Sequence, residues 1–215
     1  MIKMVNLIKQ KRRLFTKNLT PGVSVYGERL IRIKGKEYRE WVAKKSKLGA
    51  ALMKGVASPF KEESFVLYLG AATGTTVSHI SDLVPRGRVY AIEFAPEPMK
   101  KLILLAKKRK NIIPIFADAN KPESYKHILS KCDIVFQDVA QKNQVEIFIK
   151  NCKNYLKRNG TGMLAIKSRS IDVTANPSKV FREVEKKLSP LFKIEKSTRL
   201  EPYEKDHKFY VLKWK

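Results

Sequence analysis

Cysteine and histidine are scarce in this chain of 215 residues, which contains two cysteines and three histidines. Cys132 and Cys152 form no CxxC pair and have no companions at the spacing of a zinc site. We therefore expect neither a disulfide framework nor a metal site, and this cysteine usage favours a reducing cytoplasm. The sequence also lacks the run of roughly 18 to 20 apolar residues that crosses a bilayer, and no signal-peptide pattern follows its first residues. No membrane partner is expected.

Acidic residues are also few relative to basic ones. The chain has 20 Asp and Glu against 45 Lys and Arg, which gives a net charge of 45 − 20 = +25. An excess of this size favours a polyanionic partner, because the neutralisation of phosphates supplies most of the non-specific affinity for nucleic acid. A basic surface that serves only solubility is the alternative, but solubility does not require so large an excess.

From residue 65 onward, short apolar strands alternate with helical segments. Strands are expected at 65–69, 89–92, 112–116, 134–137 and 162–166, and helices at 77–83, 99–108, 145–156 and 177–188. This alternation predicts an α/β fold with a parallel sheet, in which Pro114 marks an edge or irregular strand. The last two strands, 192–198 and 208–212, have no helix between them and should be antiparallel. A parallel sheet that ends in an antiparallel hairpin is the architecture of Rossmann-like methyltransferases.

The N-terminal part of the chain is irregular and very basic. Short strands are expected at 23–26 and 30–33, and Ser46 is placed to cap a helix. We therefore predict a small β-rich N-terminal domain over residues 1–54 and a Rossmann-like domain over residues 55–215.

The turn after the first strand of the sheet has the sequence GAATGT. Gly70 and Gly74 permit close approach of a ligand to the backbone, and the amides at the start of the next helix face it. The turn departs from the dinucleotide motif GxGxxG, because position 72 is alanine. Taken alone, this turn fits a nucleoside site and a purely structural turn equally well.

Acidic residues follow three successive strands: Glu93, Asp118 and Asp138. Glu93 lies 93 − 70 = 23 residues after Gly70, where a carboxylate accepts hydrogen bonds from ribose hydroxyls. Asp118 is placed to accept a hydrogen bond from the exocyclic amine of adenine. One such acid is more often a helix cap. Three along one sheet edge favour a cationic adenosyl ligand without a pyrophosphate, so the sequence predicts S-adenosylmethionine and methyl transfer.

Several motifs resemble those of the fibrillarin family over nearly the whole chain. The matching stretches are Tyr38–Trp41, Ser46–Leu48, Leu69–Asp82, Ala91–Phe94, Asp138–Gln141, Ile166–Asp172 and Pro202–His207. The chain lacks the Gly/Arg-rich extension of eukaryotic members and is similar to archaeal ones, in whose cells there is no nucleus. Thr73 and Gly49 are small departures, because serine and alanine are common there.

The resemblance implies 2′-O-methylation of ribose in rRNA and tRNA, guided by box C/D RNA. It also implies two protein partners, a Nop-family scaffold protein and a kink-turn-binding ribosomal-type protein. Together with the turn and the strand ends, it gives the residues expected to bind the cofactor: Gly70, Ala71, Ala72, Gly74, Thr75, Thr76, Glu93, Phe94, Asp118, Ala119, Asp138, Val139, Ala140 and Gln141.

Four residues match the Lys-Asp-Lys-His catalytic set of the family: Lys47, Asp138, Lys167 and His207. A ribose 2′-hydroxyl must lose its proton as it attacks a methyl group, and a neutral lysine can accept that proton. We expect Lys167 to be the base and Asp138 to orient it and the methyl donor. Lys47 is expected to act as a neighbouring cation that favours the neutral amine, and His207 to assist the substrate ribose.

The basic residues at the site also allow a simpler interpretation. Lys47, Lys167 and Arg169 are expected to contact RNA, and for both lysines an ordinary phosphate contact is the alternative role. His79 is expected to pack or cap, and His127 to lie on the surface.

Three other functions compete with this one. A nicotinamide-dependent oxidoreductase would use a GxGxxG turn, which the sequence does not contain. A non-catalytic RNA-binding subunit that has kept the fold, and a stand-alone methyltransferase that acts on protein or on a base, both remain open on the sequence.

Overall fold

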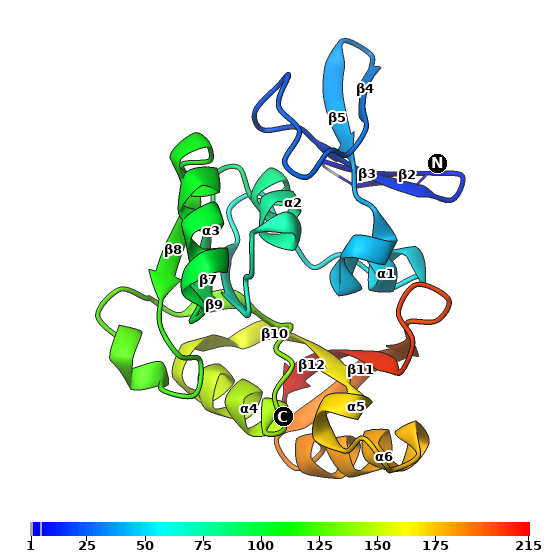
Figure 1. Cartoon of the computed structure of the whole chain (residues 1–215), viewed down its shortest axis with the longest axis vertical. Coiled ribbons are helices and arrows are strands. Elements are labelled where there is room, and N and C mark those ends of the chain that lie inside the picture. Colours follow the sequence, from blue (N-terminus) through cyan, green and yellow to red (C-terminus); the bar gives the residue numbers. More distant parts are fainter. Residues whose placement is uncertain (1, 5) are drawn as a thin grey trace.

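A seven-stranded mixed sheet forms the centre of the molecule. The computed structural model describes the backbone of residues 2–4 and 6–215, and the side chains from residue 6 onward. The strands lie in the order β11-β12-β10-β9-β6-β7-β8 (Figure 1). Their bounds are β6 (Phe65–Leu69), β7 (Arg88–Glu93), β8 (Ile112–Phe116), β9 (Cys132–Gln137), β10 (Leu156–Lys167), β11 (Phe192–Arg199) and β12 (His207–Trp214).

The direction of these strands confirms the predicted α/β fold. Strands β6 to β10 pair in parallel, and β12 is antiparallel to both β10 and β11. Pro114 lies in β8, which is an edge strand of the sheet, as its missing amide hydrogen requires. The carboxyl ends of the parallel strands therefore meet at one edge, which is where α/β proteins bind ligands.

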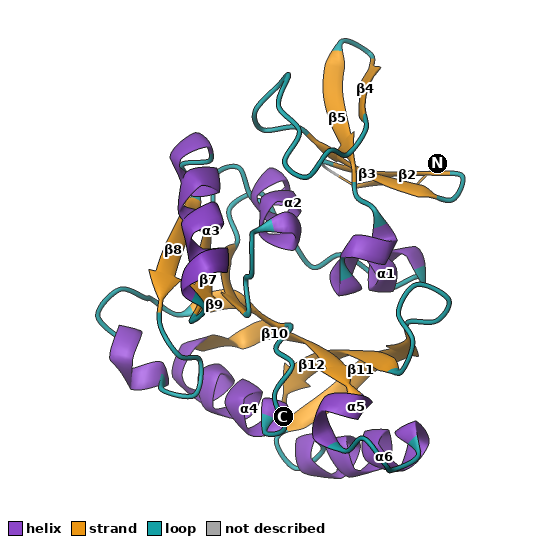
Figure 2. Ribbon diagram, viewed as in Figure 1, coloured by secondary structure: helices purple, strands orange, loops and turns teal. Residues whose placement is uncertain are grey.

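Helices cover both faces of the sheet (Figure 2). They are α2 (Thr75–Leu83), α3 (Pro96–Lys108), α4 (Gln144–Tyr155), α5 (Ser168–Ile171) and α6 (Pro177–Leu188), with a 3-10 turn, η2 (Pro122–Tyr125). Because side chains alternate along a strand, Val66 and Tyr68 of β6 join a core cluster with α2 and α3, whereas Leu67 and Leu69 join another with α4 and α6. Within the described residues, every helix is too short or too polar to span a bilayer.

A second, antiparallel sheet of five strands precedes the central sheet. Its order is β1-β2-β3-β5-β4, with bounds β1 (Ile2–Met4), β2 (Leu7–Gln10), β3 (Arg13–Lys17), β4 (Leu30–Ile33) and β5 (Lys36–Glu40). The expected strand at 30–33 is present. The expected strand at 23–26 is wrong, because this segment is a loop in which the amides of Val25 and Tyr26 donate to the Glu28 carboxylate instead of a neighbouring strand.

The two sheets are joined by a buried polar network. Arg39 of β5 is fully buried and forms ion pairs with Glu28 and, at 2.6 Å, with Asp82 of α2. Arg109 forms a second ion pair with Asp82, in which Nη1 lies 2.6 Å from Oδ1. His79 of α2 confirms its predicted packing role: it hydrogen-bonds Thr16 of β3 at 2.8 Å, and its ring is fully buried.

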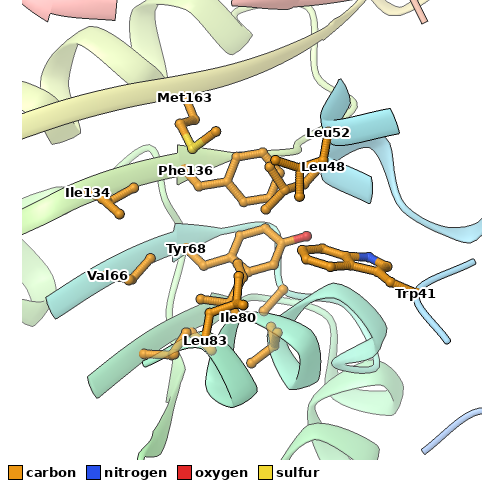
Figure 3. Close-up of a cluster of buried hydrophobic side chains, with 14 of the residues drawn as sticks. Trp41, Leu48, Leu52, Val66, Tyr68, Ile80, Leu83, Ile134, Phe136 and Met163 are labelled. Carbon is orange, nitrogen blue, oxygen red and sulfur yellow. The ribbon is translucent and has the colours of Figure 1, made fainter. Parts of the chain in front are cut away.

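A short helix continues the core from one sheet to the other. After the 3-10 turn η1 (Ala43–Lys45), Ser46 caps α1 (Lys47–Met53) by accepting a hydrogen bond from the Gly49 amide at 3.1 Å, as predicted. Figure 3 shows Trp41, Leu48 and Leu52 of this region beside Tyr68 and Phe136 of the central sheet. Because this cluster is continuous, the domain division after residue 54 stays a prediction.

Candidate active site

The turn between β6 and α2 lies directly against the end of β9. Gly70 has φ +82°, and a Cβ atom there would lie 2.5 Å from the carbonyl oxygen of Asp138. Gly74 has φ +92°, and its Cβ would lie 2.5 Å from Leu105 of α3. Both glycines are therefore required by backbone conformation and by space. Ala72 between them also adopts a left-handed conformation, with φ +47°.

Glu93 fixes this turn to the end of β7. Its buried carboxylate accepts hydrogen bonds from the amides of Ala72 at 2.8 Å, Phe94 at 3.0 Å and Ala95 at 2.8 Å. Three amide donors use only part of the acceptor capacity of a carboxylate. The side chain of Phe94 beside it is 60% exposed. The strand end thus presents a carboxylate and an aromatic ring at one place.

A cleft of about 290 Å³ lies between the turn and the strand ends. Most of the predicted cofactor residues line it: Gly70, Ala72, Glu93, Phe94, Ala119, Asp138, Val139, Ala140 and Gln141. Ile92 and Ala117 also line it and were not predicted; their only signal is that each directly precedes a predicted acidic residue. The lining contains two carboxylates and no lysine or arginine, although the chain carries a net charge of +25.

The other predicted cofactor residues lie around this cleft rather than along its wall. Ala71 is part of the buried core, and Gly74 and Thr75 form the start of α2. The Thr76 hydroxyl donates to Ser46 at 2.9 Å, which ties α2 to the cap of α1. Asp118 accepts from the backbone amide of Asn120 at 2.9 Å.

Lys47 and Asp138 form an ion pair at the mouth of the cleft. The Lys47 Nζ lies 3.0 Å from Oδ1 and 3.1 Å from Oδ2 of Asp138, and the two side chains are 25% and 18% exposed. Lys47 is the first residue of α1, so the N-terminal region delivers it to the end of β9. We expected Asp138 to orient Lys167, whereas its ion pair in the structure is with Lys47.

Lys167 and His207 lie opposite each other on the neighbouring strands β10 and β12. Lys167 is exposed, and His207 is buried. The His207 Nδ1 lies 2.6 Å from the carbonyl oxygen of Lys205, so this nitrogen carries the hydrogen and Nε2 carries the lone pair. Nε2 is buried and has no hydrogen-bond partner among the described residues.

Burial lowers the pKa of His207 below its ordinary value. The hydrogen bond to Lys205 acts in the opposite direction, and the positive charge of Lys47 lowers the pKa further. The imidazole is therefore neutral near pH 7 and presents a hydrogen-bond acceptor. The two pairs lie at adjacent strand ends, because β9, which Asp138 follows, pairs with β10, whose last residue is Lys167.

Two residues that the sequence analysis missed hold the strand ends in place. The buried side chain of Gln144 donates to the carbonyl oxygens of Gln141 at 2.9 Å and Lys167 at 3.3 Å, which joins the cleft to the end of β10. Asp206 precedes His207, and its backbone carbonyl accepts from the Ser168 amide at 3.0 Å. Asp206 lies next to His207, within the Pro202–His207 stretch that resembles the family, whereas Gln144 has no sequence signal of its own.

Arg169 also takes part in this attachment. Its Nε lies 3.2 Å from Oδ2 of Asp206. The segment after Lys167 is therefore attached to the segment before His207 by a backbone hydrogen bond, from Ser168 to Asp206, and by the Arg169–Asp206 ion pair. The predicted contact of Arg169 with RNA stays a prediction.

Comparison with known proteins places this geometry in a family. The family model described as Fibrillarin matches residues 2–215. The chain is 54% identical over 205 residues to the fibrillarin-like rRNA/tRNA 2′-O-methyltransferase of Methanosarcina barkeri, covering 94% of this chain and 91% of that protein. It is 52% identical over 203 residues to the protein of the same name from Pyrococcus furiosus, covering 94% and 89%.

Solved structures agree with these sequence matches. A fibrillarin solved in complex with Nop5p is 43% identical and superposes with a TM-score of 0.91, covering 98% of each chain. The Aeropyrum pernix fibrillarin with natively bound S-adenosyl-L-methionine is 42% identical, with a TM-score of 0.87, covering 99% of this chain and 100% of that one.

Proposed function

The chain belongs to the fibrillarin family, and from this premise we propose that it is an S-adenosylmethionine-dependent 2′-O-methyltransferase of ribose in rRNA and tRNA. The observation that carries the proposal is the Lys47–Asp138 ion pair, which lies where the acidic cleft meets the Lys167 and His207 strand ends. Such a junction brings a methyl donor in the cleft close to a ribose hydroxyl at the strand ends.

The lining of the cleft fits the cofactor. Two carboxylates and an absence of basic residues suit a ligand with a sulfonium and an ammonium, and disfavour a dinucleotide with a pyrophosphate. Glu93 has acceptor capacity left for ribose hydroxyls, and the exposed ring of Phe94 offers a surface against which a base can pack. Asp138, which lines the same cleft, would orient the methyl donor. When bound, the cofactor supplies an activated methyl group.

The residues at the strand ends orient the ribose and accept its proton. The lone pair on His207 Nε2 accepts a hydrogen bond from a ribose hydroxyl and so orients the sugar. Lys167, exposed opposite it, acts as the neutral amine and takes the proton of the 2′-hydroxyl as the oxygen attacks. Lys47 holds the Asp138 carboxylate toward the cleft. Burial lowers the pKa of His207, and the charge of Lys47 acts in the same direction.

The proposed function also requires protein and RNA partners. Because a relative was solved in complex with Nop5p, we propose that this protein also binds a scaffold protein of that kind. A box C/D guide RNA and a kink-turn-binding ribosomal-type protein complete the assembly implied by the resemblance. Guide pairing would then select the nucleotide. Both cysteines are buried free thiols, which is compatible with the reducing cytoplasm of an archaeal cell.

Methyl transfer to a defined RNA paired with a guide tests the proposal. The protein is mixed with radiolabelled S-adenosylmethionine, the guide–substrate RNA and a scaffold protein, and the product is digested with nuclease and mapped by mass spectrometry. We expect the label on one ribose 2′-oxygen. RNA binding without transfer would instead support a non-catalytic subunit, and label on a base or on protein would support a different methyltransferase.

A further inference from the structure

The N-terminal sheet has one face that packs on the central domain and one that does not. In β3, the side chains of Leu14 and Thr16 point to the central domain, where Leu14 joins the main core and Thr16 bonds His79. Phe15 between them points the other way, as strand alternation requires, and packs with Ile8 and Tyr38 in a small separate cluster. Figure 1 shows the β4–β5 hairpin projecting at the opposite end of the molecule from α6.

A basic groove lies on this outer face. It has a volume of about 700 Å³ and is lined by Gln10, Lys11, Arg12, Arg13, Phe15, Arg29 and Ile31. All four cations are exposed, and no carboxylate belongs to the lining. Arg13 has a partner in Glu40 at 3.8 Å, and because the Arg13 side chain is 53% exposed, this long pair contributes little. Lys11, Arg12 and Arg29 form no ion pair among the described residues, so the groove carries a concentration of positive charge.

A hairpin turn holds two of these cations in place. Gln10 pairs with Arg13 across β2 and β3, so Lys11 and Arg12 form the tight turn between the strands. Lys11 adopts a left-handed conformation with φ +53°. A lysine there costs about 1 kcal/mol relative to glycine. A residue that is unfavourable for the turn but supplies a charge to the groove is consistent with a binding role.

We propose that this groove binds the phosphodiester backbone of RNA. The inference rests on the proposed function, which makes RNA the polyanion that the protein meets. A protein partner is less well supported, because protein interfaces depend on exposed apolar anchors. The exposed large apolar side chains of the described residues are Leu19, Phe94, Ile103, Leu104, Phe116, Ile128 and Val173, and none of them lines the groove.

The groove is distinct from the active site. Lys47, Lys167 and Arg169 lie at the carboxyl edge of the central sheet, whereas the groove opens on the outer face of the N-terminal sheet. An RNA held in it contacts the protein with a part of the molecule other than the target ribose. The groove thus contributes to the affinity and orientation of a long or structured RNA and not to the chemical step.

A charge-neutralised variant tests the proposal. The triple variant Lys11→Gln, Arg12→Gln, Arg29→Gln removes three exposed cations and leaves the strand residues unchanged. The matched control is Lys101→Gln, Lys107→Gln, Lys110→Gln, which removes three exposed lysines of α3 and the loop after it. Both lower the net charge from +25 to 25 − 3 = +22. Binding to an RNA duplex of about 16 base pairs is measured by anisotropy against salt, without cofactor.

We expect the groove variant to lose about tenfold or more in affinity, and its slope of log K against log salt to fall by about 2 to 3, because each duplex phosphate contact adds about 0.9. The control should keep most of its slope. Arg12→Lys with Arg29→Lys, which preserves the charge, should bind like the natural chain. At saturating RNA, the rate of methyl transfer by the groove variant should be unchanged.

Three outcomes would overturn the proposal. Equal losses in the groove variant and the control would show that only overall charge matters. An unchanged salt slope in the groove variant would show that no phosphate binds there. A loss of binding to polyglutamate without a loss of binding to RNA would assign the groove to an acidic protein. Failure of the proposed function is recognised separately, because it would leave the natural chain binding RNA without transferring a methyl group.

Discussion

Lys47 and Asp138 are 91 positions apart in the sequence, and their side chains form an ion pair with both carboxylate oxygens within 3.1 Å of the same ammonium. The pair fixes the N-terminal part of the chain to the end of β9. Lys47→Ala should therefore release the Asp138 carboxylate and slow methyl transfer. The loss of one preorganised charged group at a reacting centre costs about a hundredfold in kcat.

The control for Lys47→Ala is Lys44→Ala, which removes an exposed lysine of the adjacent 3-10 turn. Single-turnover methyl transfer on saturating RNA compares the two variants. Lys44→Ala should retain the natural rate. If Lys47→Ala raises only the KM for RNA and keeps kcat, then Lys47 serves as a phosphate contact and not as part of the chemical site.

Gly70 allows a sharp test of the close approach between the cofactor turn and β9. Gly70→Ala places a Cβ atom 2.5 Å from the Asp138 carbonyl oxygen at a backbone φ of +82°. Gly22 has the same φ of +82° with nothing within 4 Å of its Cβ position. Gly22→Ala should therefore lose only the conformational part, about 1 kcal/mol in unfolding free energy.

Gly70→Ala should lower the free energy of unfolding more than Gly22→Ala does, because the Asp138 segment must also move. We expect its affinity for S-adenosylmethionine to fall at least about tenfold, which corresponds to about 1.4 kcal/mol. Urea unfolding and calorimetric titration measure the two effects. Equal stability and unchanged cofactor affinity in the two variants would mean that the turn tolerates displacement, and that its contact with β9 is not required.

The inner parallel strands of the central sheet could be predicted because they are buried on both faces. Phe65–Leu69 is apolar at every position, which is typical of a parallel strand between two helical layers. The N-terminal sheet could be predicted only in part. Arg13–Lys17 begins and ends with a cation, and its neighbour Leu7–Gln10 ends in polar residues, so their pattern predicts a basic, irregular segment.

The candidate site, like the fold, could be predicted only in part. Glu93 and Asp138 were found because strand ends are fixed by the local apolar pattern. The partner of Asp138 was not found from the pattern, because the position of Lys47 depends on how α1 docks across the core. Gln144 and Asp206 act through backbone carbonyl groups, and the sequence contains no sign of which carbonyl a side chain will reach.

His79 should make the protein less stable in acid. Burial lowers its pKa well below the ordinary value of 6.5, and the charges of Arg39 and Arg109 act in the same direction. The unfolded chain therefore binds a proton at this residue as the pH falls below 6.5, while the folded chain does not. Stability is fully present above that pH and is lost below it, by up to about 1.4 kcal/mol per pH unit.

Urea unfolding between about pH 5 and pH 8 measures this effect in the natural chain and in His79→Gln. The glutamine retains polar atoms near Thr16 and Tyr26 but does not titrate. His79→Gln should be less stable at neutral pH, and its stability should change less with pH on the acid side. The same acid slope in both proteins would assign the loss to other groups, among them His207, whose pKa is also lowered by burial.

The last prediction separates two roles for Arg169. In the structure, its guanidinium holds Asp206, which has φ +58° directly before His207. If this clamp positions His207, then Arg169→Ala and Asp206→Asn should each lower kcat several-fold with little change in the KM for RNA. The double variant should then be no worse than either single one, because both changes remove the same ion pair.

A contact between Arg169 and an RNA phosphate gives a different pattern. Arg169→Ala would then raise the KM and reduce the salt dependence of RNA binding, while Asp206→Asn would not. Additive effects in the double variant would also contradict the clamp. Because Ser168 bonds to the backbone carbonyl of Asp206, it keeps the loop attached in every variant, so the cycle measures the ion pair and not the folding of the loop.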